Sequence, residues 1–164
     1  MQYAAFLRGI GPGNPNMRGP KLCSVFERLG FTKVASVISS GNVVFETTSR
    51  NSAALEKAVE EALPKYLGFQ RLVIIRSRTE LQQLVKRQPF QGQKHGQGHY
   101  LIVSFPKNKR AAPAGVVCTA IDQTRDQPQE VMTDLERKYA KAVTTRTWLT
   151  VERVLRKMEE VATE

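Results

Sequence analysis

The stretch FLRGIGPGNPNMRGPKL, residues 6–22, has the layout of a phosphate-binding loop, because three glycines separate an apolar run from an amphipathic segment. The P-loop pattern GxxxxGK[ST] is absent, and Asn16 stands where the dinucleotide-binding fingerprint needs its third glycine. Two prolines also remove backbone N–H groups that a phosphate would use. The composition therefore favours a turn-forming connection. The alternative is an anion site in which Arg8, Arg18 and Lys21 surround a helix N-terminus.

A second polar stretch, VISSGNVVF at residues 37–45, contains the adjacent serines Ser39 and Ser40. A catalytic serine needs an activating base, and neither a GxSxG pattern nor a histidine partner is evident. The Gly-Asn pair between two apolar runs is typical of a two-residue hairpin turn. Asn42 is also a candidate wall of an anion-binding pocket.

The third stretch is TTRTWLTVERVL, residues 144–155, which holds four threonines and the only tryptophan of the chain. Threonine hydroxyls at a helix start, together with Arg146, could bind a phosphate. Equally, Trp148 could anchor the last helix, with the threonines as caps. The residue types fit both interpretations, so Thr145, Arg146 and Trp148 are candidate anion ligands.

Metal and thiol chemistry find little support in the sequence. Cys23 and Cys118 lie in apolar segments without an adjacent histidine, which is typical of buried, reduced thiols. His95 and His99 are close in sequence, but no third ligand stands nearby, so we expect solvated loop residues. We predict neither a metal nor a cofactor, and no catalytic motif is present, so enzymatic activity stays an open question.

The chain is strongly basic along its whole length. Its 164 residues carry a formal net charge of +10, with 11 basic and 6 acidic side chains in residues 1–82 and 14 and 9 in residues 83–164. Such a field attracts polyanions and phosphorylated metabolites. No apolar run approaches the roughly 20 residues of a membrane span, and the N-terminus lacks a signal-peptide pattern, so we expect a cytoplasmic protein.

The elements that must position these residues follow from hydrophobic periodicity. Apolar residues recur with helical spacing over 22–29, 55–63, 131–139 and 151–161, and a capping box formed by Thr79 and Gln82 predicts a further short helix. Asn51 or Ser52 can cap the second helix and Asp126 the fourth. Strands are predicted at 3–10, 34–39, 43–47, 72–75, 100–105 and 116–121.

The predicted order over residues 3–76 is β-α-β-β-α-β, the split βαβ or ferredoxin-like arrangement. We therefore predict an α/β (α+β) protein with a ferredoxin-like part at 1–90. A smaller C-terminal part with the order ββαα, residues 99–164, would pack on it. One face of the first sheet would be covered by its two helices, and the C-terminal part is the natural cover of the other.

The three polar stretches also carry a resemblance to a protein family. LRGI after the first strand, SGNVVF at the hairpin and TRTWLTV near the C-terminus resemble the uncharacterised bacterial family called domain of unknown function 1697. That family usually has Asn where Thr147 stands here, and a polar residue at Leu149. The resemblance implies an α/β fold with a ferredoxin-like part, and it implies no activity.

The leading functional hypothesis is a basic domain that binds an anionic partner, nucleic acid first. The main alternative is an enzyme or binder for a small phosphorylated or carboxylated metabolite, and the third is a protein-interaction domain without a ligand. The signature of the RNA recognition motif is absent. The oligomeric state is not indicated. The candidate ligands are Arg8, Arg18, Lys21, Asn42, Thr145, Arg146 and Trp148.

Overall fold

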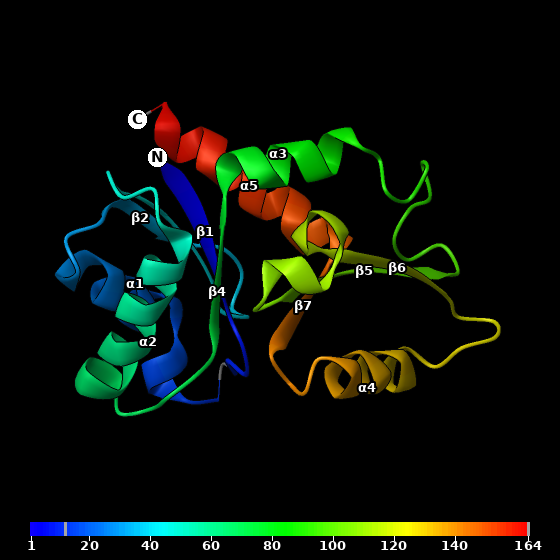
Figure 1. Ribbon diagram of the computed structural model, residues 1–164, viewed down its shortest axis with the longest axis horizontal. Coiled ribbons are helices and arrows are strands. Elements are labelled where there is room, and N and C mark those ends of the chain that lie inside the picture. The colour runs from blue at the N-terminus through cyan, green and yellow to red at the C-terminus, as the bar shows by residue number, and fades with distance from the viewer. Residues whose placement is uncertain (12, 164) are drawn as a thin grey trace. The chain divides into compact units, whose positions relative to one another are not determined.

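The computed structural model describes residues 1–11 and 13–163, which form two compact units (Figure 1). The first unit comprises Met1–Gln82 and Arg153–Glu164, and the second comprises Gln83–Glu152. The predicted division of the chain into two parts, 1–90 and 99–164, stays a prediction. In the compact units, the end of the last helix belongs to the first unit.

The first unit is built on a four-stranded sheet with the strand order β2-β3-β1-β4, in which all paired strands are antiparallel. Its elements in chain order are β1 (Gln2–Leu7), a 3-10 turn (Pro15–Met17), α1 (Gly19–Arg28), β2 (Thr32–Ser36), β3 (Asn42–Glu46), α2 (Ser52–Leu67) and β4 (Val73–Ser77). Strand β3 lies between β1 and β2, which is the order of a split βαβ unit. The predicted α+β class is confirmed.

The core of this unit forms where the sheet meets α1 and α2. Alternate residues of β1, β3 and β4 face these helices, and Leu22, Phe26 and Val59 of the helices are buried against them. The opposite sheet face is buried as well, since Ala4, Phe6, Val44 and Ile74 are at most 1% exposed. Burial on both faces explains why β1 is almost continuously apolar.

Two further helices each have residues in both units. Helix α3 (Arg78–Lys86) follows β4 directly, and α5 (Trp148–Ala162) ends the chain. Within the first unit, the Gln2 side chain donates to the carbonyl of Met158 at 2.8 Å, so the last turns of α5 lie beside β1. In the part of the chain that the structure describes, no helix is long and apolar enough to cross a membrane.

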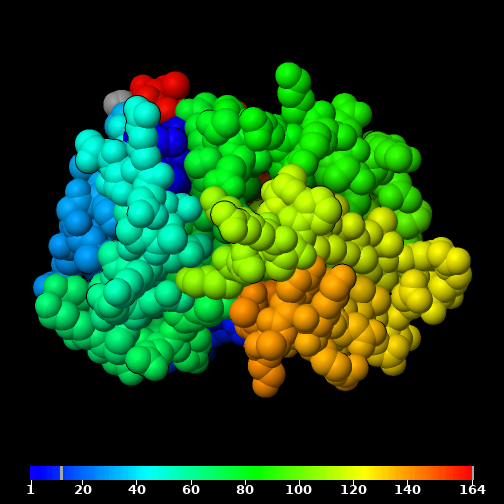
Figure 2. Space-filling model, in the orientation of Figure 1, coloured from blue at the N-terminus to red at the C-terminus, as the bar shows by residue number. Residues whose placement is uncertain are grey.

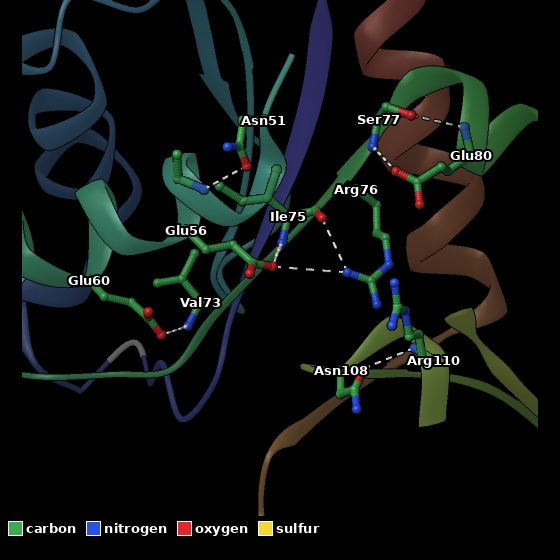
Figure 3. Close-up of polar contacts among 11 residues, drawn as sticks. Asn51, Glu56, Glu60, Val73, Ile75, Arg76, Ser77, Glu80, Asn108 and Arg110 are labelled. Atoms are coloured by element: carbon green, nitrogen blue, oxygen red, sulfur yellow. Dashed lines mark hydrogen bonds and ion pairs between the residues drawn. The ribbon is translucent and has the colours of Figure 1, made fainter. Parts of the chain in front are cut away.

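Strand β4 is an edge strand whose outward N–H groups are all taken by carboxylates (Figure 3). The N–H of Val73 donates to Glu60 at 3.0 Å, and the N–H of Ile75 donates to Glu56 at 2.8 Å. Glu56 and Glu60 are one turn apart on α2, so their spacing matches alternate residues of the strand. Because these outward N–H groups are already bonded, the edge of β4 has few donors with which a further strand could pair.

The third outward N–H, that of Ser77, donates to Glu80 at 3.0 Å, and the N–H of Glu80 donates back to the Ser77 hydroxyl at 3.1 Å. This reciprocal pair is the capping box of α3. The predicted box of Thr79 and Gln82 is therefore wrong by two residues, because the strand continues to Ser77 and the helix begins at Arg78.

The second unit contains a three-stranded antiparallel sheet with the order β6-β5-β7. Its elements are β5 (His99–Pro106), two 3-10 turns (Lys109–Ala111 and Pro113–Gly115), β6 (Val117–Asp122), α4 (Pro128–Lys138) and β7 (Val143–Thr147). Helix α4, gold in Figure 2, lies on the surface, and none of its residues is buried.

Strand β7 was not predicted, so the expected ββαα order is replaced by β-β-α-β-α. The sequence predicts helix caps and ligands from residue 144 onward, whereas the β-branched side chains of residues 143–147 suit a strand that pairs with β5. Asp126 does not cap α4. The N-cap is Gln127, which makes no side-chain capping bond, because Pro128 opens the helix.

The hairpin between β2 and β3 also differs from the prediction. The connection spans residues 37–41 rather than two, because Ile38 and Gly41 both adopt left-handed φ, 58° and 83°. A Cβ on Gly41 would lie 2.7 Å from Cγ1 of Ile10, so glycine is required there by close approach as well as by its dihedral angle. Its carbonyl accepts the N–H of Leu7 at 2.9 Å.

Candidate functional site

The seven candidate ligands divide between the two units. Arg8, Arg18, Lys21 and Asn42 lie in the first, and Thr145, Arg146 and Trp148 lie in the second. Each group is described within its own unit.

The glycine loop after β1 is held by bonds within the first unit. The Arg71 guanidinium donates to the carbonyl of Gly9 at 3.2 Å. Asn14 accepts the N–H of Asn16, and the Asn16 amide donates to the carbonyl of Leu67 at 3.2 Å. These turn bonds are those of a shaped strand-to-helix connection. Pro12 lies outside the described residues.

The cations near this loop differ in exposure. Arg8 is half-buried, and its N–H donates to the carbonyl of Leu72 at 2.9 Å. Arg18 occupies the N-cap position of α1 without a side-chain capping bond, and Lys21 lies in the first turn. Both are exposed. The two stay candidates for contact with an anion in solvent.

Asn42 has a role in its own turn. The side chain is 1% exposed, and its amide donates to the carbonyl of Val37 and to the hydroxyl of Ser40, both at 3.0 Å. Both amide protons are therefore engaged within residues 37–42. The opening of β3 accounts for this asparagine without any ligand.

A basic and aromatic surface on α1 and α2 was missed from the sequence. The guanidinium of Arg28 lies 4.8 Å from the ring centre of Tyr66, and the Lys65 ammonium lies 5.2 Å from it. Tyr66 is 37% exposed. Lys21 and Arg28 are two helical turns apart, so they share one side of α1. The seven-residue spacing of Lys21 and Arg28 is the feature of the sequence that could have indicated this surface.

In the second unit, neighbouring residues of β7 point to opposite faces of the sheet. The Thr145 hydroxyl shares a hydrogen bond with that of Ser104 at 2.8 Å. Arg146 points to the other face, where its guanidinium donates to the Thr144 hydroxyl at 2.6 Å and to the carbonyl of Thr145 at 3.0 Å. Burial lowers the pKa of Arg146 to about 10. Thr145 and Arg146 therefore do not converge on one ligand.

The residue that follows has a capping role. The Thr147 hydroxyl accepts the N–H of Thr150 at 3.3 Å, which caps the start of α5. Asparagine is also a good N-cap residue. The residue that the family has at this position can therefore be replaced by threonine while the cap is kept.

Trp148, the first residue of α5, lines a cavity of about 300 Å³. Its ring meets Phe90 edge to face, with ring centres 5.2 Å apart and an interplanar angle of 69°. The other wall is formed by Val85, in the last turn of α3, and by residues 88–93, which follow that helix. Glu152 also lines the cavity, one helical turn beyond Trp148. The remaining polar lining residues are Gln88, Gln91 and Gln93.

The segment that walls this cavity has an unusual backbone. Gln88 and Gln91 adopt left-handed φ angles of 48° and 50°, and Gly92 follows with 82°. For a residue with a Cβ this conformation costs about 1–2 kcal/mol. Two such residues in a cavity wall are a pattern that recurs at functional sites. Trp148 is a candidate from its sequence context, whereas the glutamines and Glu152 carry no such signal in the sequence.

Comparison with known proteins places the fold and the family. The structure of SP0830, a conserved bacterial protein from Streptococcus pneumoniae, is similar with a TM-score of 0.69, 17% sequence identity and coverage of 96% of this chain and 98% of that chain. At this identity the likeness concerns the fold. No curated protein matches the sequence significantly.

The family model described as "Protein of unknown function (DUF1697)" matches residues 1–139. The match includes the first two motifs of the resemblance and ends before β7, so the TRTWLTV motif lies beyond it. Since the matched residues make up most of the chain, the protein belongs to the DUF1697 family.

Proposed function

We propose that this protein binds nucleic acid through the second unit. One observation carries the proposal: exposed cations accompany the aromatic cavity. Lys86 and Arg87 lie in sequence between the lining residues Val85 and Gln88, and Lys94 follows the lining residue Gln93. Proteins that bind single strands combine aromatic rings, on which bases stack, with cations that follow the phosphates.

The charge distribution around this segment supports the same function. No aspartate or glutamate occurs between Glu80 and Asp122, whereas six lysines and arginines do. An acid-free stretch of this length lets a phosphate backbone approach without local repulsion. The one carboxylate in the cavity wall, Glu152, comes from α5 rather than from this stretch.

A small phosphorylated metabolite is the second candidate, and the cavity favours it over a protein-interaction role. A volume of about 300 Å³ lies at the lower end of the range for small-molecule sites. The same three cations would then bind a single phosphate group instead of a chain of them.

The test is fluorescence anisotropy with labelled mixed-sequence RNA and DNA oligonucleotides at stated, near-physiological salt, because a basic protein binds any oligonucleotide at low salt. The informative variant is Lys86→Gln combined with Arg87→Gln. The matched control is Arg137→Gln, which removes an exposed cation that pairs with Asp134 at 3.3 Å. Arg146→Ala is less suitable, because its guanidinium bonds within β7 and its loss could disturb folding.

We expect micromolar binding by the unaltered protein. The double variant should bind at least tenfold more weakly, with a salt slope smaller by about 1.4 if two phosphate contacts are lost. The control should bind as the unaltered protein does. Absence of binding at physiological salt, or equal binding by the double variant and the control, would overturn the proposal and direct attention to phosphorylated metabolites.

A further inference from the structure

We infer that the cavity beside Trp148 binds a guanine base. The inference rests on the proposed function and deepens it, since it names the base that this site would select. It depends on the polar groups of the cavity, which are separate from the cations that would bind phosphate.

The aromatic lining suits a planar ring. Phe90 is 5% exposed and forms an inner wall, while Trp148 is half-buried and presents part of its ring to the cavity. The edge-to-face contact holds the two rings at 69° to each other, so a planar ligand can stack on only one of them. Trp148 is the more exposed of the two and is the stacking surface.

Glu152 determines which base fits. Trp148 and Glu152 are four residues apart on α5, so their side chains lie on one side of the helix, one turn from each other. Among the residues that the structure describes, no hydrogen bond or ion pair engages the Glu152 carboxylate. A base stacked on Trp148 would therefore turn its edge toward an uncommitted pair of acceptor oxygens.

Only one common base matches that pair. Guanine presents two neighbouring donors, N1–H and the N2 amino group, which a carboxylate accepts side by side. Adenine and cytosine each place an acceptor beside their amino group, which would face the carboxylate unfavourably. Uracil and thymine have one N–H between two carbonyl oxygens. The negative charge of Glu152 thus favours guanine and disfavours the other bases.

The glutamines complete the complementarity. Within residues 1–11 and 13–163, the side-chain amides of Gln88, Gln91 and Gln93 make no hydrogen bond, so they can donate to the acceptor atoms O6 and N7 of guanine. The N–H of Gln91 donates to the carbonyl of Gln88 at 3.0 Å, and that of Gln93 to Phe90 at 2.9 Å. These turns fix the backbone from which the amides project.

Trp148 is the only tryptophan of the chain, so its fluorescence reports on this cavity alone. We would titrate the full chain with guanosine, inosine and adenosine 5′-monophosphates, which carry the same phosphate. Inosine lacks the N2 amino group of guanine and keeps N1–H. Stacking should quench the fluorescence saturably, with binding about tenfold weaker for inosine than for guanosine and weaker still for adenosine, because hydrogen bonds to charged groups are lost.

The variant Glu152→Gln should abolish the preference for guanosine over adenosine, whereas Glu159→Gln, an exposed carboxylate further along α5, should leave it unchanged. The comparison of the three nucleotides uses the unaltered protein, so it stands even if the variant fails to fold. Equal quenching by all three nucleotides, or no saturable quenching, would overturn the inference.

The outcome is separable from that of the proposed function. Oligonucleotides that bind equally with and without guanine, combined with no quenching by the mononucleotide, would remove the guanine site and leave nucleic-acid binding in place. Selective quenching by guanosine monophosphate without any binding of oligonucleotides would remove the proposed nucleic-acid binding and leave the guanine site in place. The cavity would then be a site for a guanine nucleotide.

Discussion

Replacing Glu56 tests how the edge of β4 is stabilised. One oxygen of this carboxylate accepts the N–H of Ile75 at 2.8 Å and lies 4.0 Å from the guanidinium of Arg76 (Figure 3). The side chains of Glu56 and Arg76 are 8% and 1% exposed. Both interactions therefore operate away from solvent, where a lost partner is costly.

The expected magnitude follows from these two interactions. Two unit charges at 4 Å attract by about 4 kcal/mol at an effective dielectric constant of 20, and the cost of desolvating the carboxylate offsets much of this gain. A hydrogen bond to a charged acceptor contributes about 1.5–3 kcal/mol. Glu56→Gln keeps an oxygen for the Ile75 N–H and should destabilise by about 1–2 kcal/mol. Glu56→Ala loses both interactions and should cost about 3–5 kcal/mol.

The measurement is urea unfolding followed by far-UV circular dichroism, with the free energy taken at constant m-value. Helix α2 supplies a matched control, because Glu61 pairs with Lys57 at the same 4.0 Å but is 69% exposed. Glu61→Gln should change the free energy of unfolding by less than about 0.5 kcal/mol. A Glu56→Gln variant no less stable than Glu61→Gln, or equal costs for Gln and Ala at position 56, would refute this account of the edge.

Three further outcomes are expected. Gly41→Ala should lower the free energy of unfolding by about 2–4 kcal/mol, since its new Cβ would meet a side chain at 2.7 Å, whereas Gly30→Ala, at a similar φ of 88° with open space, should cost only about 1–2 kcal/mol, as urea unfolding would measure. Because burial lowers the pKa of Arg146 to about 10, the unfolded chain, in which the side chain keeps its ordinary higher pKa, binds more protons above this pH. Stability should therefore rise with pH from about 9.5 to 11 relative to Arg146→Gln in denaturation curves at each pH. Burial raises the pKa of both Cys23 and Cys118, so iodoacetamide at neutral pH should alkylate them more slowly than free cysteine, and equal rates would contradict the burial.

The first unit was largely predictable from periodicity. The apolar positions of α1 and α2 become its core, the expected Asn51 cap forms with the N–H of Ala54 at 3.1 Å, and Gly68 ends α2 with a φ of 78°. When a helix has one apolar face, the sequence predicts which side of the helix is buried, because burial of that face stabilises the helix most. The observed strand order, β2-β3-β1-β4, is that of the split βαβ arrangement expected from the β-α-β-β-α-β sequence of elements.

Polar residues inside this frame gave no such signal. Glu56 stands beside apolar positions of α2 and Arg76 in an apolar run, and both are buried. Periodicity assigns a charged residue to the surface by default, and only the outward donors of β4 explain why carboxylates are favoured here. Strand β7 could not be predicted for the same reason, because its polar threonines suggest ligands or helix caps when the partner strand β5 is not known.

The candidate cavity could not be predicted because its walls come from separate parts of the chain. Trp148 and Glu152 have helical spacing, which marks a shared helix side, but the segment 85–93 that faces them is distant in sequence and its glutamines look like loop residues. The net charge gave no location either, because the two halves of the chain carry the same basic excess, although the acid-free stretch between Glu80 and Asp122 is visible in the sequence.

The two proposals assign affinity and selectivity to different groups, and salt should separate them. Phosphate contacts by Lys86 and Arg87 release counterions, so affinity for every oligonucleotide should fall steeply as salt rises. Hydrogen bonds between Glu152 and a stacked base release none. The ratio of affinities for guanine-containing and guanine-free strands should therefore stay constant across the salt series, whereas a ratio that falls toward one with salt would mean that selectivity arises from the phosphate contacts.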